Sequence, residues 1–239
     1  MSDTTPSPEA PETEPTQDEK LLEGSIRARQ KFWKRYGQIE SGVLTALNNP
    51  VYMGGPKWPA LRPSFVRVKR TNSVLIASDG LSDPWPGEEA KGQGFGLELF
   101  MESRDKDLRS KSWEELKASW FFQTLYNVAQ TAAHKQDFHQ ILAEDGLFSM
   151  ELGLVNAPAH LMNKDERVGV LVGVEPKSIT PELRMPLAKI KLAAVMLLTP
   201  DELAYSIAEG LPGQKKLNKL LRKRGYHHFS SVERPSVVK

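Results

Sequence analysis

The 239-residue sequence contains no cysteine, and this absence excludes several kinds of chemistry. Disulfides, thiolate zinc sites, iron–sulfur clusters and cysteine nucleophiles all require that side chain. The sequence also has no apolar run of the roughly 18 residues that a membrane-spanning helix needs. Its first 20 residues lack the basic start and the apolar centre of a signal peptide. We therefore expect a protein of the cytoplasm that has no membrane partner.

Charge is nearly balanced over the whole chain, at a formal +2, but it is distributed unevenly. Residues 1–20 hold six acids and one base among several prolines, whereas residues 211–239 hold eight bases and one acid. A proline-rich acidic segment without large apolar side chains is typical of a disordered tail. We expect such a tail over residues 1–20, a folded domain over 21–210, and a basic helix and tail over 211–239.

The hydrophobic pattern predicts both strands and helices. Six apolar or alternating runs are typical of strands, at residues 65–70, 73–78, 95–101, 147–152, 168–174 and 190–198. Amphipathic periodicity and helix-start motifs predict four helices, at about residues 19–36, 112–134, 200–210 and 214–224. Strands and helices do not alternate regularly. The predicted class is α+β, with a mixed, largely antiparallel β-sheet packed against the long α-helix at 112–134.

Three carboxylates form a candidate chemical site. Asp79 and Asp83 lie in one Gly/Pro-rich loop, and Glu98 lies on the strand that follows it. Together they could carry out acid–base catalysis or hold a divalent cation, as in a metal-dependent hydrolase. A structural role is the alternative: the aspartates accept backbone N–H groups within the turn, and Glu98 is either solvated or paired with a base. We favour the structural role.

Other catalytic and metal motifs do not fit the sequence. Gly92, Gly94 and Gly96 do not form a dinucleotide fingerprint, because Leu97 stands where a glycine is needed and a strand follows. No two of the five histidines have the i, i+4 spacing of a helical zinc site. His227–His228 lie beside the basic helix and are expected in a solvated tail. We predict no metal, no cofactor and no catalytic residue.

A basic patch is expected on the last predicted helix, at Lys215, Lys216, Lys219, Arg222, Lys223 and Arg224. Such a cluster could grip the phosphates of a nucleic acid. No aromatic residues are interleaved with these bases to stack on nucleobases. We therefore favour a solvated face, or a contact with the acidic N-terminal tail, and keep nucleic-acid association as an alternative.

Two short motifs resemble the suppressor of fused family, which shows a Gly-Leu-Ser-Asp turn followed by a Gly-Phe-Gly-x-Glu-Leu strand. The matching residues are Gly80, Leu81, Ser82 and Asp83 in the turn, then Gly94, Phe95, Gly96 and Glu98 in the strand. The likeness continues through a Trp-rich helix at 113–134 and a Leu-Thr-Pro-Asp-Glu-Leu turn at 198–203. It covers roughly residues 30–210 and is similar to bacterial, single-domain members.

The resemblance implies a non-enzymatic α+β domain that binds another protein. Animal members sequester transcription factors by clamping an extended peptide between two lobes, and this chain matches the first lobe. Many single-domain members act as immunity proteins, so the partner implied here is a toxin. We expect the partner to contact the 79–94 loop through Asp83, Trp85, Glu88 and Glu89, with Trp85 as an aromatic anchor. The alternative is that Trp85 only covers the edge of the sheet.

Overall fold

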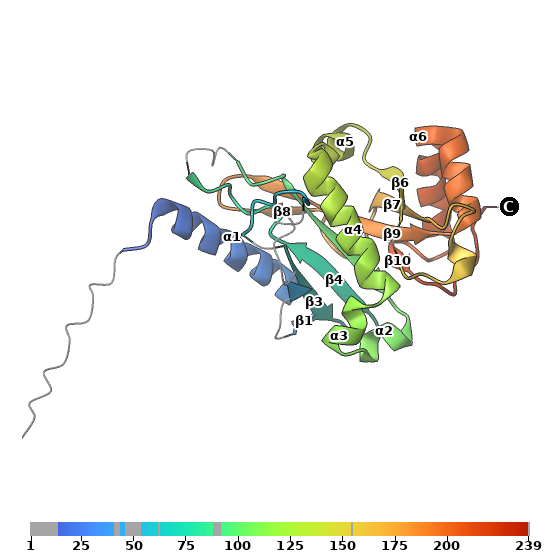
Figure 1. The fold of residues 1–239 in the computed structure, drawn as a ribbon, viewed down its shortest axis with the longest axis horizontal. Helices are drawn as coiled ribbons and strands as arrows, with labels where there is room; N and C mark the ends of the chain where they lie inside the picture. The colour runs from blue at the N-terminus through green and yellow to red at the C-terminus, as the bar shows by residue number, and fades with distance from the viewer. Residues whose placement is uncertain are drawn as a thin grey trace, which may run out of the picture.

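The computed structural model describes residues 14–40, 44–45, 54–61, 63–87, 92–153 and 155–238. Within these residues the chain forms one ten-stranded sheet in the order β1-β3-β4-β5-β9-β7-β6, with β2 on β3, β8 on β9 and β10 on β5 (Figure 1). The strands are β1 (Gln38–Ile39), β2 (Leu44–Thr45), β3 (Ser64–Lys69), β4 (Val74–Asp79), β5 (Leu97–Ser103), β6 (Phe148–Leu152), β7 (Val168–Val174), β8 (Glu182–Arg184), β9 (Lys189–Leu198) and β10 (Phe229–Ser230).

The sheet is mixed and largely antiparallel, as the sequence predicts. Only the pairs β5–β9 and β5–β10 are parallel among the described strands. Every residue of β5 is buried, because helices cover the sheet on both faces. β4 shows the consequence: Val74 and Ile76 pack into one core, while Leu75 and Ala77 pack into the other.

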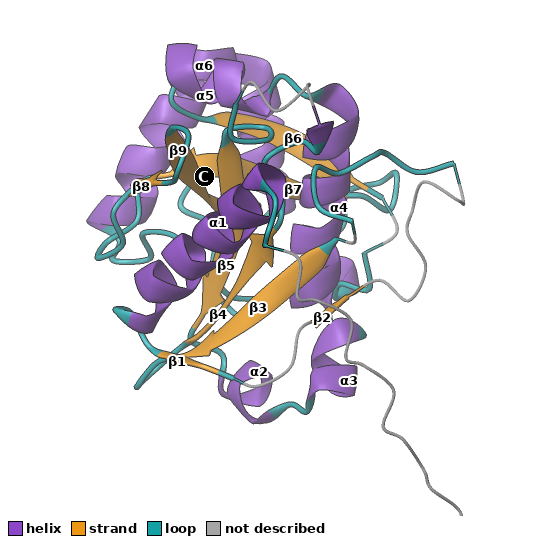
Figure 2. Cartoon of the chain, turned by 90° about the vertical axis from the view of Figure 1, so that its left-hand side faces the viewer, coloured by secondary structure: helices purple, strands orange, loops and turns teal. Residues whose placement is uncertain are grey.

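Helices form a layer on each side of the sheet (Figures 1 and 2). They are α1 (Gln17–Lys34), α2 (Lys106–Ser110), α3 (Trp113–Lys117), α4 (Trp120–Lys135), α5 (Phe138–Glu144), the 3-10 helix η3 (Ala159–Leu161) and α6 (Pro200–Lys223). The apolar side of α4 packs against β4, β5 and β6. The side chains of Phe32 and Trp33 from α1, and of Leu217 and Leu221 from α6, belong to the opposite core.

The prediction of one helix over 112–134 is wrong in one respect, because the segment forms two helices. The predicted capping box of Ser112 and Glu115 begins α3. Seven residues later, the side chain of Ser119 accepts a hydrogen bond from the backbone N–H of Phe122 and caps a second helix. A second N-cap at Ser119, whose backbone is extended, allows one helix to end and another to begin without leaving backbone donors unsatisfied.

The first helix begins earlier than predicted. Thr16 and Glu19 form a capping box, so α1 starts at Gln17, and residues 17–20 belong to this helix rather than to a tail. Residues 1–13, which make up most of the predicted acidic tail, lie outside the described residues. At the other end of the chain, the two predicted helices meet at Gly210, whose non-helical φ of 58° and ψ of −148° bend α6 where the sequence predicts a break.

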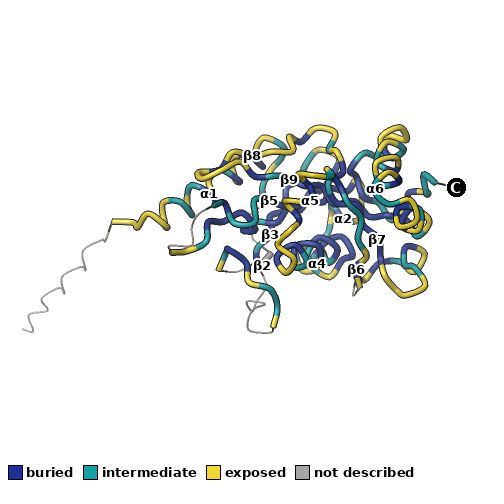
Figure 3. Tube along the Cα trace, turned by 90° about the horizontal axis from the view of Figure 1, so that it is seen from above, coloured by how far each residue is buried: buried dark blue, intermediate teal, exposed yellow. Residues whose placement is uncertain are grey.

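The segment after α6 returns to the sheet instead of projecting into solvent. β10 pairs with β5, and the ring Nε2 of the fully buried His228 lies 2.8 Å from Glu102 Oε2. His228 Nδ1 accepts the backbone N–H of Lys177 at 3.3 Å, which leaves Nε2 to donate to Glu102. Further on, Arg234 pairs with the buried Glu202. The expectation of a solvated tail is therefore wrong for His228, and residues 225–238 pack against the domain (Figure 3).

Candidate functional site

The two motif segments lie side by side at the end of β4. The backbone N–H of Phe95 donates to the Leu81 carbonyl at 2.8 Å and closes the loop between the segments. Gly94 has a φ of +49°, and a Cβ there would lie 2.4 Å from the Leu81 oxygen. Gly80 has a φ of +134°, and a Cβ there would meet Ala60 at 2.6 Å. Both positions need glycine because the backbone is left-handed and the neighbouring chain is in contact.

The Glu98 side chain stabilises this turn through hydrogen bonds to its backbone. This side chain, on β5, is fully buried. Oε1 accepts the backbone N–H groups of Gly80 and Ser82 at 3.0 Å each and the Ser82 hydroxyl at 2.6 Å, while Oε2 accepts the Ser78 hydroxyl. Of the two alternatives drawn from the sequence, a solvated Glu98 is wrong. The side chain is a buried acceptor that fixes the conformation of residues 80–82.

Arg29 of α1 joins the three candidate carboxylates. Its Nε contacts Asp79 Oδ1, its Nη2 lies 2.6 Å from Asp83 Oδ1, and its Nη1 lies 3.8 Å from Glu98 Oε1. Nη1 also donates to the Ser82 hydroxyl at 3.2 Å. Sequence analysis brings the carboxylates together but misses Arg29. The signal was available, since Arg29 falls three residues after Ile26 and four before Trp33, on the apolar stripe of its helix.

The electrostatics of this cluster follow from three carboxylates facing one guanidinium. Burial opposes the charge on Arg29, but Glu98, Asp79 and Asp83 outweigh it and raise the pKa of Arg29. Burial, only partly opposed by Arg29, raises the pKa of Glu98 to about 7 and also raises the pKa of Asp83. The guanidinium fills the space between the carboxylates that a metal ion would need. Among the described residues, no group of three or more His, Asp or Glu side chains is arranged to hold a metal.

A groove of about 540 Å³ opens above this cluster, between α1 and two loops. Its floor includes the carboxylates of Asp79 and Asp83. Its walls are mainly apolar and come from Leu22 and Ile26 of α1, from Pro59, Ala60 and Leu61, and from Pro84, Trp85 and Pro86. Trp85 is half-buried, packs edge-on against Phe95 at 5.5 Å between ring centroids, and has Lys57 Nζ 5.4 Å from its ring centre.

The structure thus places part of the predicted partner surface in one groove. Asp83 and Trp85 both line it, the first at the floor and the second at the wall. Glu88 and Glu89 lie outside the described residues. The motif residues Gly80, Leu81, Ser82, Gly94 and Glu98 form the hydrogen-bonded turn next to Asp79 and Asp83, whereas Gly96 lies against His139.

The predicted basic patch is a different surface. Lys215, Lys216, Lys219, Arg222, Lys223 and Arg224 are all exposed on the second half of α6. Arg222 pairs with Glu175, and Lys216 Nζ lies 5.6 Å from the ring centre of Tyr205. Figure 1 shows α1 and α6 at opposite ends of the molecule, so the groove and the patch do not form one site.

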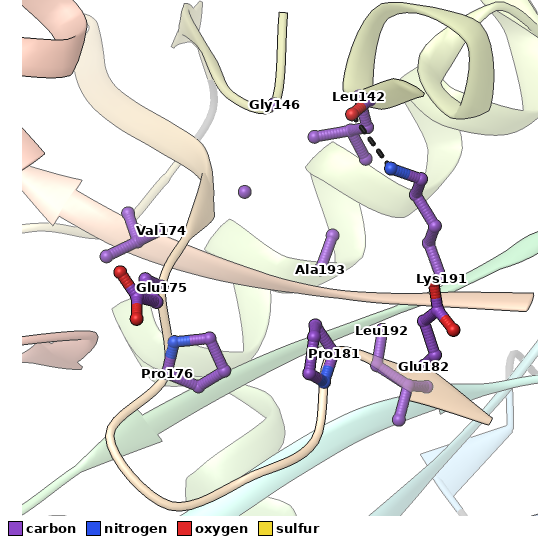
Figure 4. A pocket seen from close by; sticks show the side chains of 11 residues that line it. Leu142, Gly146, Val174, Glu175, Pro176, Pro181, Glu182, Lys191, Leu192 and Ala193 are labelled. Carbon is purple, nitrogen blue, oxygen red and sulfur yellow. Dashed lines mark hydrogen bonds between the residues drawn. The ribbon is translucent and has the colours of Figure 1, made fainter. Parts of the chain in front are cut away.

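A smaller hollow of about 210 Å³ lies next to a β-bulge in β7 (Figure 4). Lys191 Nζ donates to the Leu142 carbonyl at the end of α5, at 2.9 Å. The two acidic side chains at its edge are paired outside it, Glu175 with Arg222 and Glu182 with Lys189. Its polar groups are therefore already satisfied, and we assign it no ligand.

The fold described above, a mixed sheet between two helical layers, defines an α+β domain, and comparison with known proteins identifies its type. No family model and no curated protein matches the sequence. Among solved structures, a chain of the Sufu–Fu complex crystal structure is similar, with a TM-score of 0.52 and 15% identity over 91% of this chain and 92% of that chain.

The crystal structure of Drosophila Suppressor of Fused is also similar, with a TM-score of 0.52 and 16% identity over 91% of this chain. The match covers 51% of the Drosophila chain, so this chain spans about half its length. The protein therefore has a suppressor-of-fused-like fold, which confirms the resemblance seen in the motifs. No helix in the described parts of the chain is long and apolar enough to cross a membrane.

Proposed function

We propose that this chain is a non-enzymatic protein-binding module that sequesters another protein through the groove between α1 and residues 83–86. The groove itself carries the proposal: it is mainly apolar, open to solvent, and has a half-buried tryptophan at its wall. Trp side chains are enriched at binding hot spots, because a large rigid ring buries much area at little entropic cost. The likeness to a structure of the Sufu–Fu complex supports a protein as the ligand.

The distribution of exposed apolar residues supports the same surface. Large exposed apolar side chains are few in the described residues: Leu61, Leu187 and Ile207. Leu61, with 86% of its surface exposed, stands at the groove. Together with the apolar lining of the groove, Leu61 forms a contiguous apolar surface, and such patches mark interaction sites.

The finer form of the proposal is an immunity protein that binds and neutralises a toxin in the bacterial cytoplasm. Its support is the resemblance of the motifs to single-domain bacterial members and the match to half of the longer Drosophila chain. Such a role requires stable binding and no chemistry from this chain. It predicts that the partner arrests growth when expressed alone and is silenced by co-expression of this protein.

The test is quantitative affinity capture from the native host's lysate, using the full chain because residues 225–238 pack against the domain. Ile26→Gln and Trp85→Ala alter the groove, and Ile207→Gln makes the same change as the first on an exposed residue of α6. We expect the wild type and Ile207→Gln to retain one stoichiometric protein, and the two groove variants to lose it. Equal retention by all variants would show that the groove is not the site. Recovery of nucleic acid instead of protein would favour the basic patch.

A further inference from the structure

The groove is charged as well as apolar. Its lining holds four carboxylates, from Asp18, Glu19, Asp79 and Asp83, and one cation, Arg29. The acidic groups lie at two places, with Asp18 and Glu19 in the first turn of α1 and the two others at the floor. Between them lies the apolar stretch of Leu22, Ile26 and Trp85. A ligand must therefore combine apolar side chains with positive charge.

The positive charge of Arg29 is paired inside the protein with the carboxylates of Asp79, Asp83 and Glu98. Its side chain is only 3% exposed, and all three of its nitrogens face the carboxylates or Ser82. Because Glu98 shares the same guanidinium from below, the buried cluster keeps an excess of negative charge. Burial is the main cause of the raised pKa values of Glu98 and Asp83, and the nearby charge of Asp79 raises both further.

Of the three carboxylates around Arg29, Asp79 is the one most accessible from the groove. Its side chain is 18% exposed, the largest exposure of the three carboxylates. Oδ1 contacts Arg29, and within the described residues no hydrogen bond reaches Oδ2. A carboxylate that is held in place on one oxygen and open on the other is ready to accept a charge-assisted hydrogen bond from an incoming cation.

The acidic rim is fixed as well. Asp18 Oδ2 accepts the backbone N–H of Gly87 at 2.8 Å, and Glu19 Oε2 accepts the backbone N–H of Thr16 at 2.7 Å. Both side chains remain exposed. Lys57 Nζ lies over the ring of Trp85, close to the groove, but Lys57 does not line it and leaves the four carboxylates of the lining unpaired by this lysine.

We propose, on the basis of the proposed partner groove, that its occupant is a segment of a partner protein in which a lysine or arginine is flanked by apolar residues. The apolar side chains pack between Leu22, Ile26 and Trp85. The cation lies against Asp79 at the floor, and further basic residues face Asp18 and Glu19. Burial of the apolar flanks strengthens the ion pair, since water is displaced from around it.

The experiment is a selection from a displayed library of random 12-residue peptides on the full-length protein, followed by affinity measurements on synthetic peptides. We expect the selected peptides to be enriched in Lys or Arg next to apolar residues, and to lose binding on Ile26→Gln but not on Ile207→Gln. Asp79→Asn should weaken them about tenfold, as expected for loss of one charge-assisted contact. Asp165→Asn, an exposed aspartate outside the groove, is the matched control and should leave the affinity unchanged.

A second charge variant keeps the test decisive if Asp79→Asn does not fold. Glu19→Gln keeps an acceptor for the capping box but removes the charge, and it should also weaken the peptides. Groove-dependent peptides without basic residues, or an affinity unchanged by both charge variants, would overturn the inference and leave the proposed function standing. A selection that yields no peptide sensitive to Ile26→Gln would count against both.

Discussion

Replacing Glu98 by glutamine should remove a pH-dependent part of the stability of this fold. The side chain is fully buried and has the pKa raised to about 7 by burial, against an ordinary value of 4.5. Glutamine has the same shape and keeps an acceptor for the turn at residues 80–82, but it has no charge. Below its ordinary pKa, Glu98 is protonated in both the folded and the unfolded chain, so the wild type and Glu98→Gln should then differ least.

The sign of the effect follows from the direction of the shift. A carboxyl whose pKa is higher in the folded state contributes stability that is present below pH 4.5 and is lost as the pH rises through about 7. The gap between these two values corresponds to about 3 kcal/mol of unfolding free energy. Relative to the wild type, Glu98→Gln should therefore gain about 3 kcal/mol between pH 4.5 and pH 7.5.

The assay is urea unfolding at several pH values across this range, followed by tryptophan fluorescence and circular dichroism. The quantity of interest is the difference in unfolding free energy between variant and wild type. Glu144→Gln, on the exposed end of α5, is the control for the chemical change, and its difference from wild type should stay constant. A constant difference for Glu98→Gln, or one that falls as the pH rises, would refute the account of the buried cluster.

Further substitutions test the same cluster and its surroundings by urea unfolding. Arg29→Met should lower the unfolding free energy by about 3–5 kcal/mol, because it leaves buried carboxylates uncompensated, and Glu98→Gln in the same chain should restore part of the loss; no loss would show that the pairs contribute nothing. Gly94→Ala should lower it by at least about 1 kcal/mol through backbone strain and contact, while Gly92→Ala, with open space around its Cβ, should be nearly neutral. Arg234→Met should cost about 3–5 kcal/mol if the C-terminal segment is an integral part of the domain, and a wild-type stability would show that it is not.

Local signals made the main elements predictable. The apolar runs of β4, β7 and β9 and the caps at Ser112 and Thr199 are strong enough to be recognised in a single sequence. The motif residues at 80–83 and 94–98 then identified the fold, because their glycines and Glu98 serve one closely packed turn. The signals that were overlooked are also local: the capping box that begins at Thr16 and the second cap at Ser119.

The remaining features depend on contacts between distant parts of the chain. The two-residue strands β1, β2 and β10 exist because they pair with longer strands, and two residues carry no periodicity. His228 becomes buried through Glu102, which lies 126 positions earlier in the sequence. The apolar stripe of α1 indicates that Arg29 is buried, but no local pattern shows that its partners are carboxylates 50 or more positions later. The partners of buried polar residues are what sequence analysis of this protein could not predict.

The most direct test of the central claim is hydrogen exchange on the full-length protein, alone and in complex with the partner recovered by affinity capture. We predict that binding protects backbone amides in the first half of α1 and those of Asp83 and Trp85, which line the groove. Amides in the second half of α6, beneath the basic patch, should exchange at the same rate in both states. Protection confined to α6, with the groove unchanged, would contradict the assignment of this groove as the binding site.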